Sequence, residues 1–147
     1  MSPAVRVELM DWDTARPLAA PLRFEVFVAE QKVPEESELD DQDPHSVHAV
    51  AFDPSGAVVG TGRLLPDGHI GRMAVRREAR RLGVGSALLT ALMGEARRRG
   101  HARAVLSAQT HAIAFYRRHG YRVASGEYLD CGIAHVDMTC ELPADGR

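Results

Sequence analysis

The clearest feature of the sequence is a helical pattern that begins directly after a basic, glycine-containing turn. Apolar residues recur at the spacing of one helix face from Val84 to Ala96. The pattern stops at Arg97–Gly100, where cations and a final glycine are typical of a helix end. A strand-like segment, 69–75, precedes the turn. The chain is therefore expected to form a strand, a turn and a long helix in direct succession.

Short apolar segments separated by turn residues surround this unit. The turn-forming sequences at 53–56 and 66–68 predict an antiparallel meander of three strands. Acids and prolines replace the apolar periodicity between Glu30 and Pro44, which predicts a long loop with at most one helical turn. Strands are expected at 5–9, 47–52, 58–65, 69–75, 102–107, 121–125 and 134–142, and helices from Asp13 or Thr14 to Val28, from 84 to the 97–100 segment and at 112–119. This order defines an α/β protein.

Length and composition limit the kinds of protein to consider. A chain of 147 residues, 45% of them hydrophobic and 26% charged, is typical of one globular domain, here 1–147. A net charge of −2 provides no overall attraction for nucleic acid, and no apolar segment approaches the roughly 20 residues that span a membrane. Cys131 and Cys140 lack metal-ligand spacing and are expected to be reduced thiols in a cytoplasmic protein, with a disulfide as the alternative.

The turn before the long helix has the composition of an anion site. Gly83 and Gly85 have no side chains, so backbone N–H groups can approach a ligand there, and the positive end of the helix dipole favours negative charge. A pyrophosphate is expected at this turn; the alternative is a loop with solvated arginines. A dinucleotide fingerprint would need glycine at Leu88, and a P-loop would need Gly-Lys-Ser/Thr, which is absent.

The matching residues of a first motif are Arg80-x-x-Gly83-x-Gly85 after a strand that ends Met73-Ala74-Val75. This segment resembles the coenzyme A motif of the GNAT superfamily of acyltransferases, although many members have glycine where Arg81 stands. The resemblance implies a single GNAT-like domain with a central mixed, mostly antiparallel twisted sheet flanked by helices. It also implies that the backbone around Met73 and Val75 pairs with pantetheine and that residues 81–86 hold the pyrophosphate. The expected coenzyme-binding residues are Met73, Ala74, Val75, Arg80, Arg81, Leu82, Gly83, Val84, Gly85 and Ser86.

A second segment resembles the downstream motif of the same family. It reads Gln109-x-x-Ala112-Ile113-x-Phe115-Tyr116-x-x-x-Gly120-Tyr121, and the resemblance implies a tyrosine beside the coenzyme sulfur. Tyr116 is the expected general acid, because a phenol can donate a proton to a departing thiolate whose pKa is about 8.5. Its alternative role is core packing beside Phe115. Gln109, Phe115 and Tyr116 complete the expected coenzyme site.

Charged and polar residues spread over the chain carry a further likeness. They are Arg23, Phe27, Glu30, Gln31, Glu38, Asp40, Asp43, His48, Arg63 and the segment 132–135. This set is similar to the ElaA-like branch of the superfamily, and part of it also resembles acyl-homoserine lactone synthases, which share the fold. The paired Arg and Asp side chains either order the long loop by ion pairing, which is the favoured interpretation, or line an amine pocket.

An acceptor amine must be neutral when it attacks, so a base is expected to take its proton. Glu30, His48 and His135 are the candidates. His45-x-x-His48, beside three nearby aspartates, raises the alternative of a metal site, because imidazole and carboxylate are metal ligands. A turn with solvated acids is the favoured interpretation, and no metal is expected.

Together these features predict an N-acyltransferase. The expected reaction transfers an acetyl group from acetyl-CoA, as acyl-donor cosubstrate, to a primary amine of a small molecule or peptide by direct attack in a ternary complex. No nucleic-acid or membrane partner is expected, and a homodimer is possible. The alternatives are an acyl-homoserine-lactone-synthase-like acyltransferase and a non-catalytic acyl-CoA-binding regulatory module.

Overall fold

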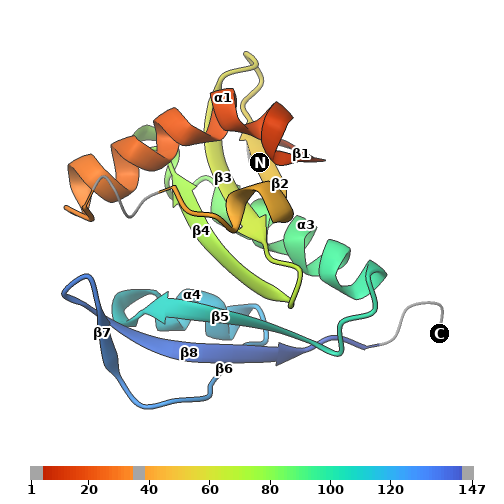
Figure 1. The fold of residues 1–147 in the computed structure, drawn as a ribbon, viewed down its shortest axis with the longest axis vertical. Helices are drawn as coiled ribbons and strands as arrows, with labels where there is room; N and C mark the ends of the chain where they lie inside the picture. The colour runs from red at the N-terminus through yellow and green to blue at the C-terminus, as the bar shows by residue number, and fades with distance from the viewer. Residues whose placement is uncertain (1–4, 35–38, 144–147) are drawn as a thin grey trace.

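The computed structural model describes residues 5–34 and 39–143 and shows an open sheet with helices on its faces (Figure 1). The strand order is β1-β2-β3-β4-β5-β8-β6, and β7 pairs with β8. β4 and β5 run parallel, and the other neighbouring strands run antiparallel. The prediction of an α/β protein with a mixed, mostly antiparallel sheet is confirmed.

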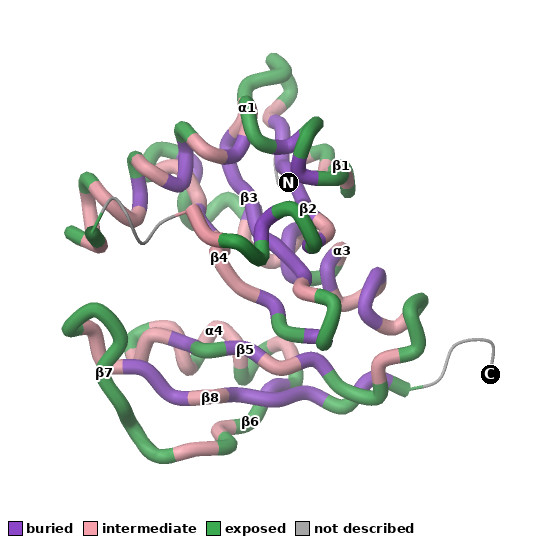
Figure 2. The backbone as a smooth tube through the Cα atoms, in the orientation of Figure 1, coloured by how far each residue is buried: buried purple, intermediate pink, exposed green. Residues whose placement is uncertain are grey.

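The N-terminal half of the sheet is buried on both faces at its two central strands. Its strands are β1 (Arg6–Met10), β2 (Val47–Phe52), β3 (Val58–Leu64) and β4 (His69–Val75), and the last three form the predicted meander. Val50 and Phe52 pack against helix α1 (Trp12–Arg23), whereas Ala49 and Ala51 join the core cluster on the α3 side. Figure 2 shows β2 and β3 as almost continuously buried strands. A strand with two buried faces needs small and apolar residues at nearly every position.

Helix α1 begins two residues earlier than the sequence suggested. The side chain of Asp11 accepts a hydrogen bond from the Thr14 N–H at 2.9 Å, so Asp11 is the cap. The expected caps, Asp13 and Thr14, already lie in the first turn and are wrong. Asp and Thr are both common N-cap residues. The sequence pattern alone did not show which of these neighbouring residues comes directly before the first helical turn.

The chain continues from α1 directly into η1 (Phe24–Glu30), a π-helix. The Gln31 N–H donates to the Val26 carbonyl at 3.1 Å, five residues earlier, which is the wider spacing of a π-helix. Segments of π-helix are rare and often occur at functional sites. Here η1 carries the predicted helix past Val28 and brings its last residues to the middle of the sheet.

An opening lies between the two central strands. β4 pairs with β5 (Arg103–Gln109) only at His69–Val105 and Ile70–Leu106, and beyond these pairs the strands diverge (Figure 1). A bulge in β4 marks the divergence: its register with β3 shifts, and Arg72 adopts a left-handed φ of 49°. Because a bulged strand bends away from its ladder, β4 leaves β5 at this point.

Helix α3 (Val84–Arg98) follows β4 after a short 3-10 turn, η3 (Arg77–Ala79), and confirms the predicted strand, turn and helix. Its apolar face contacts β3 closely at two glycines. A Cβ atom on Gly60 would lie 2.8 Å from Val84 Cγ1, and one on Gly62 would lie 2.9 Å from Leu92 Cδ1. These glycines therefore set the distance between α3 and the sheet.

The C-terminal half of the sheet is covered on one face only. It consists of β5, β6 (Arg122–Val123), β7 (Tyr128–Asp130) and β8 (Ile133–Glu141), with η4 (Thr110–Ala112) and α4 (Ile113–Arg118) beside them. Along β5, Ala104, Leu106 and Ala108 are buried, whereas Ser107 between them is exposed. Figure 1 shows α4 behind β5 and β8 and no helix in front of them. A polar sheet face thus remains open beside the opening.

Two C-terminal predictions need correction. The strand expected at 121–125 is reduced to β6, and β7 was not predicted. β7 forms a hairpin with β8 through Cys131 and Gly132, whose φ angles are 50° and 78°. This hairpin was not predicted because the first residue of its turn, Cys131, is not glycine. Residues other than glycine rarely adopt the left-handed backbone conformation.

The remaining predictions concern the loop, the cysteines and possible ligands. A single 3-10 turn, η2 (Asp43–His45), interrupts the described part of the loop; residues 35–38, which include Glu38, lie outside the described residues. Cys131 and Cys140 are free thiols, as expected. Among the described helices, none has the length and apolar character to cross a membrane. Within the same residues, no three His, Cys, Asp or Glu side chains are grouped to hold a metal ion.

Candidate active site

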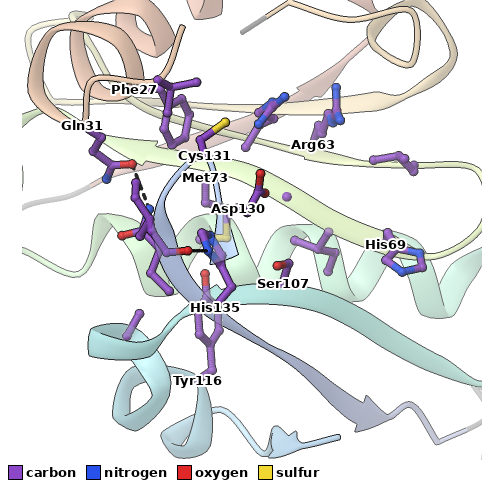
Figure 3. A pocket seen from close by; sticks show the side chains of 18 of the residues that line it. Phe27, Gln31, Arg63, His69, Met73, Ser107, Tyr116, Asp130, Cys131 and His135 are labelled. Atoms are coloured by element: carbon purple, nitrogen blue, oxygen red, sulfur yellow. Dashed lines mark hydrogen bonds between the residues drawn. The ribbon is translucent and has the colours of Figure 1, made fainter. Parts of the chain in front are cut away.

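The opening between β4 and β5 belongs to a cavity of about 720 Å³. Side chains from η1, β4, β5, α4 and the β7–β8 hairpin surround it (Figure 3). Apolar contacts come from residues such as Phe27 and Met73, and polar groups come from the opposite strands. Polar and ionisable side chains of the lining include Gln31, Ser107, Gln109, Tyr116 and His135. A volume of this size is typical of a small-molecule site.

The turn before α3 has the backbone of an anion site. Gly83 adopts a φ of 82° and is the N-cap of α3, without a side-chain cap. The first intrahelical bond runs from the Ala87 N–H to the Gly83 carbonyl, so the preceding N–H groups have no partner within the helix. A Cβ on Gly83 would have nothing within 4 Å, whereas Gly85 lies against Phe115. The N–H groups of residues 83–86 can thus bind a negatively charged group.

Arg80 does not present a free guanidinium at this turn. Its Nη atoms donate to the two Glu30 carboxylate oxygens at 3.0 and 2.7 Å, and its Nε donates to the Val75 carbonyl at 2.9 Å. Hydrogen bonds from Arg80 are the main cause of the lowered pKa of Glu30; burial acts in the opposite direction, and the charge of Arg80 and the hydrogen bond and charge of Arg77 add to the lowering. Arg80 therefore joins the turn to η1, and Glu30 is an ion-paired carboxylate that is poorly suited to accept a proton at neutral pH.

The end of β4 has one edge without a neighbouring strand. Ala74 and Val75 pair with Thr61 and Gly60 of β3 on one side, and β5 has already diverged on the other. Met73 lines the cavity, whereas the Ala74 side chain is buried against α1 and η1. The free edge offers backbone groups to an extended ligand arm, although the Val75 carbonyl already accepts the bond from Arg80.

Tyr116, in α4, points its hydroxyl into the cavity (Figure 3). Its ring packs edge-on against Phe115 and Tyr121, with centroid distances of 5.1 and 5.8 Å. Burial raises the pKa of Tyr116 to about 12. The phenol therefore keeps its proton throughout the neutral and moderately alkaline range, as a hydrogen-bond donor in the cavity must.

Two glutamines connect the two sides of the opening. Gln109, at the end of β5, donates to the Gln31 side chain at 2.8 Å, and this bond is dashed in Figure 3. The Gln109 oxygen accepts a bond from His111 Nε2 at 2.7 Å. Gln109 was expected near the coenzyme. Its partner Gln31 was not predicted, because the two residues are 78 positions apart.

His135 is the candidate base that lies in the cavity. Its Nδ1 donates to the Ile133 carbonyl at 2.7 Å, because a carbonyl oxygen can only accept. In the neutral ring the proton is thus on Nδ1, and Nε2 keeps a free lone pair. The ring also stacks on Tyr128, at a centroid distance of 6.0 Å and an interplanar angle of 21°. The backbone bond and the stacked ring together fix the orientation of His135.

His48 lies elsewhere, inside a buried group of charges. Its Nε2 bonds to the Asp43 carbonyl at 2.9 Å, and its ring stacks on Trp12 at 4.7 Å. Burial is the main cause of the lowered pKa of His48, which therefore stays neutral. It is absent from the cavity lining. A role in packing and in holding the loop fits these contacts better than a role as a base.

The predicted Arg and Asp pairs form a connected cluster. Arg23 pairs with Asp43 at 2.8 Å, and Arg63 pairs with Asp40 at 2.7 Å and with Asp43 at 2.9 Å. Burial acts to raise the pKa of Asp40, but the hydrogen bonds and charge of Arg63 outweigh it and bring that pKa down to about 2. These bonds attach the loop to α1 and β3, which favours the structural interpretation, although Arg63 also borders the cavity.

Comparison with known proteins gives consistent matches. The family model for the acetyltransferase (GNAT) domain matches residues 15–142. The chain is 43% identical over 121 residues to the uncharacterised N-acetyltransferase YjcF of Bacillus subtilis, which covers 80% of this chain and 86% of YjcF.

Two solved structures have similar backbones. An acyl-CoA N-acyltransferase of Pseudomonas aeruginosa is 29% identical, with a TM-score of 0.82 over 93% of this chain and 99% of that one. ElaA of Escherichia coli is 23% identical, with a TM-score of 0.83 over 94% of this chain and all of that one (100%), and shares the fold.

Proposed function

Because the chain belongs to the GNAT acetyltransferase family, we propose that it transfers an acetyl group from acetyl-CoA to a primary amine of a small molecule or peptide. The amine attacks the thioester directly, with both substrates bound at once. The observation that carries this proposal is the opening between β4 and β5: Tyr116 and the diverging strand β4 line its cavity, and β4 leads along the chain to the uncapped start of α3.

The coenzyme pyrophosphate would bind at residues 81–86. The supporting features are the left-handed Gly83, which has nothing within 4 Å of a Cβ position, and the helix start without a side-chain cap, since both leave N–H groups accessible to a ligand. The pantetheine arm would lie along the free edge of β4 near Met73. Arg80 is assigned a different role from the phosphate contact that its motif implies: it holds the turn against η1 through Glu30.

Tyr116 would act on the leaving sulfur. Cleavage of a thioester leaves a thiolate, and a phenol that remains protonated can donate a hydrogen bond and then a proton to it. The raised pKa of Tyr116 supports this role because it guarantees the protonated form. An exposed tyrosine would begin to ionise near its ordinary pKa of about 10.

His135 would take the proton that an alkylammonium acceptor must lose before it can attack. The free Nε2 lone pair, the fixed ring and the position in the cavity lining support this assignment. Glu30 and His48 are less suited, since the first is ion-paired and the second lies outside the cavity lining.

A direct test is to titrate purified protein with acetyl-CoA by calorimetry and then to follow thiol release with a panel of amines and amine-bearing peptides. We expect binding of acetyl-CoA and amine-dependent thiol release. Binding without turnover on any amine would instead favour the regulatory module, and no detectable binding of any acyl-CoA would refute the proposal.

A further inference from the structure

A chain of three polar side chains leads out of the cavity through the β7–β8 hairpin. Ser107 lines the cavity, whereas Tyr128 and Asp137 are outside its lining. The Ser107 Oγ and the Tyr128 hydroxyl are hydrogen-bonded, and the Tyr128 hydroxyl donates to Asp137 Oδ1 at 2.6 Å. Ser107 and Asp137 are also direct partners in the β5–β8 register. The network therefore connects the cavity wall with the partly exposed carboxylate of Asp137, which lies outside the cavity lining.

The directions of these hydrogen bonds follow from the number of protons. A tyrosine has one hydroxyl proton, and the carboxylate of Asp137 can only accept it. Ser107 must then donate its own proton to the Tyr128 oxygen. Since Ser107 Oγ still has a free lone pair, it can accept a further proton from a group in the cavity.

Acetyl transfer to an alkylammonium acceptor releases one proton that must leave the site. An alkylammonium acceptor loses two protons from nitrogen as it becomes an amide. One proton is needed by the departing sulfur, which becomes a thiol: Tyr116 supplies this proton, and the proton held by His135 then replaces it on Tyr116. The other must leave the site for solvent, and His135 alone can hold only one at a time. Ser107 and Tyr128 are exposed to solvent, but two bound substrates exclude much of the water that would otherwise carry this proton from the cavity.

We propose that Ser107, Tyr128 and Asp137 form the path by which the second proton of the acceptor nitrogen leaves the cavity; this inference rests on the proposed acetyl transfer. The nitrogen gives its proton to Ser107 Oγ as the Ser107 proton passes to the Tyr128 oxygen and the Tyr128 proton passes to Asp137 Oδ1. Asp137 is left as a carboxylic acid and releases the proton to water. The hydrogen bonds then return to their initial directions.

The structure offers a substitution that separates this role from packing. Tyr128 also stacks on His135, so its loss as a whole would disturb the base. Tyr128→Phe keeps the stacked ring and removes only the hydroxyl. Asp137→Asn tests the outer end of the path without changing either ring. Tyr121→Phe is the matched control, because the Tyr121 hydroxyl is buried without a hydrogen-bond partner among the described residues.

The test measures kcat by thiol release in a weak buffer, with and without added imidazole as an external proton acceptor. We expect Tyr128→Phe and Asp137→Asn each to lower kcat by about tenfold to a hundredfold, and the double variant to lose no more than either single one. Imidazole should restore most of the loss in the variants and leave wild type and Tyr121→Phe unchanged. A purely structural network predicts no restoration.

The outcomes distinguish the two proposals. If wild type acetylates amines and Tyr128→Phe is equally active in weak buffer, the proton path is refuted while acetyl transfer stands. A loss of kcat that imidazole does not restore, in variants with unchanged thermal unfolding, refutes the path as well. If wild type acetylates no amine, the proposed function itself fails.

Discussion

Replacing Tyr116 with phenylalanine tests the proposed chemistry most directly. The change removes the hydroxyl that points into the cavity and keeps the ring that packs against Phe115 and Tyr121. Because those edge-on contacts involve only the rings, Tyr116→Phe should fold normally. The variant should therefore report on the hydroxyl alone.

The size of the effect follows from two pKa values. The pKa of Tyr116 is about 12, whereas an ordinary thiol has a pKa of about 8.5. Full proton transfer to a solvated thiolate would then be uphill by about 5 kcal/mol, at 1.36 kcal/mol per pKa unit. Burial in the same cavity also raises the pKa of the thiol, which reduces this cost. The hydroxyl is thus expected to contribute mainly as a hydrogen bond to developing charge, about 1.5–3 kcal/mol, or about 10- to 150-fold in rate.

The assay measures kcat by thiol release and the affinity for acetyl-CoA by calorimetry. Tyr116→Phe should lower kcat by about 10- to 150-fold and change the dissociation constant of acetyl-CoA by less than about twofold. In wild type, the raised pKa means that loss of the Tyr116 proton should not reduce kcat below about pH 11. An unchanged kcat, or a loss that appears entirely in acetyl-CoA affinity, would refute the reasoning.

Three further predictions concern the coenzyme turn, the core and the charge cluster. Glu30→Gln should raise the KM for acetyl-CoA up to about fivefold, because Glu30 holds Arg80 and partly exposed ion pairs contribute up to about 1 kcal/mol. Glu78→Gln is the control. A fall in kcat at unchanged KM would instead favour Glu30 as the base. Gly60→Ala should lower the free energy of unfolding in urea by about 1–3 kcal/mol, since its Cβ would meet Val84 and Leu88, whereas Gly94→Ala, with nothing within 4 Å, should not destabilise the protein. The pKa of Asp40 is lowered from 3.8 to about 2, so its stabilising effect is complete above about pH 4 and is lost as the pH falls toward 2. Asp40→Asn should therefore flatten the decrease in unfolding free energy over this pH range. An unchanged acid-unfolding curve would contradict the assignment.

Local patterns in the sequence predicted much of the fold and the glycine-containing turn before α3. The apolar period of α3 and the turn signals of the β2–β4 meander depend on neighbouring residues, so the chain order alone reveals them. Gly83 and Gly85 were predicted for the same reason, because a glycine before a helix has few structural uses. Tyr116 was expected in the site from its motif, and it lines the cavity.

Features that depend on distant residues could not be predicted in the same way. The partner of Arg80 is Glu30, 50 positions away, and the partner of Gln109 is Gln31. The divergence of β4 from β5 requires a bulge at Arg72 whose left-handed backbone no sequence signal marks. Without β7, Tyr128 could not be placed beside His135, so the network beyond the cavity was also missed.

The one-sided cover of β5 and β8 has a consequence for how such a protein can diversify. Figure 1 shows no helix in front of this face, so exposed side chains there can be replaced without a core being repacked. The half of the sheet between α1 and α3 is filled on both faces and tolerates far less change. If the proposed acetyl transfer holds, acceptor preference can change by single substitutions on this face while the filled half of the sheet stays the same.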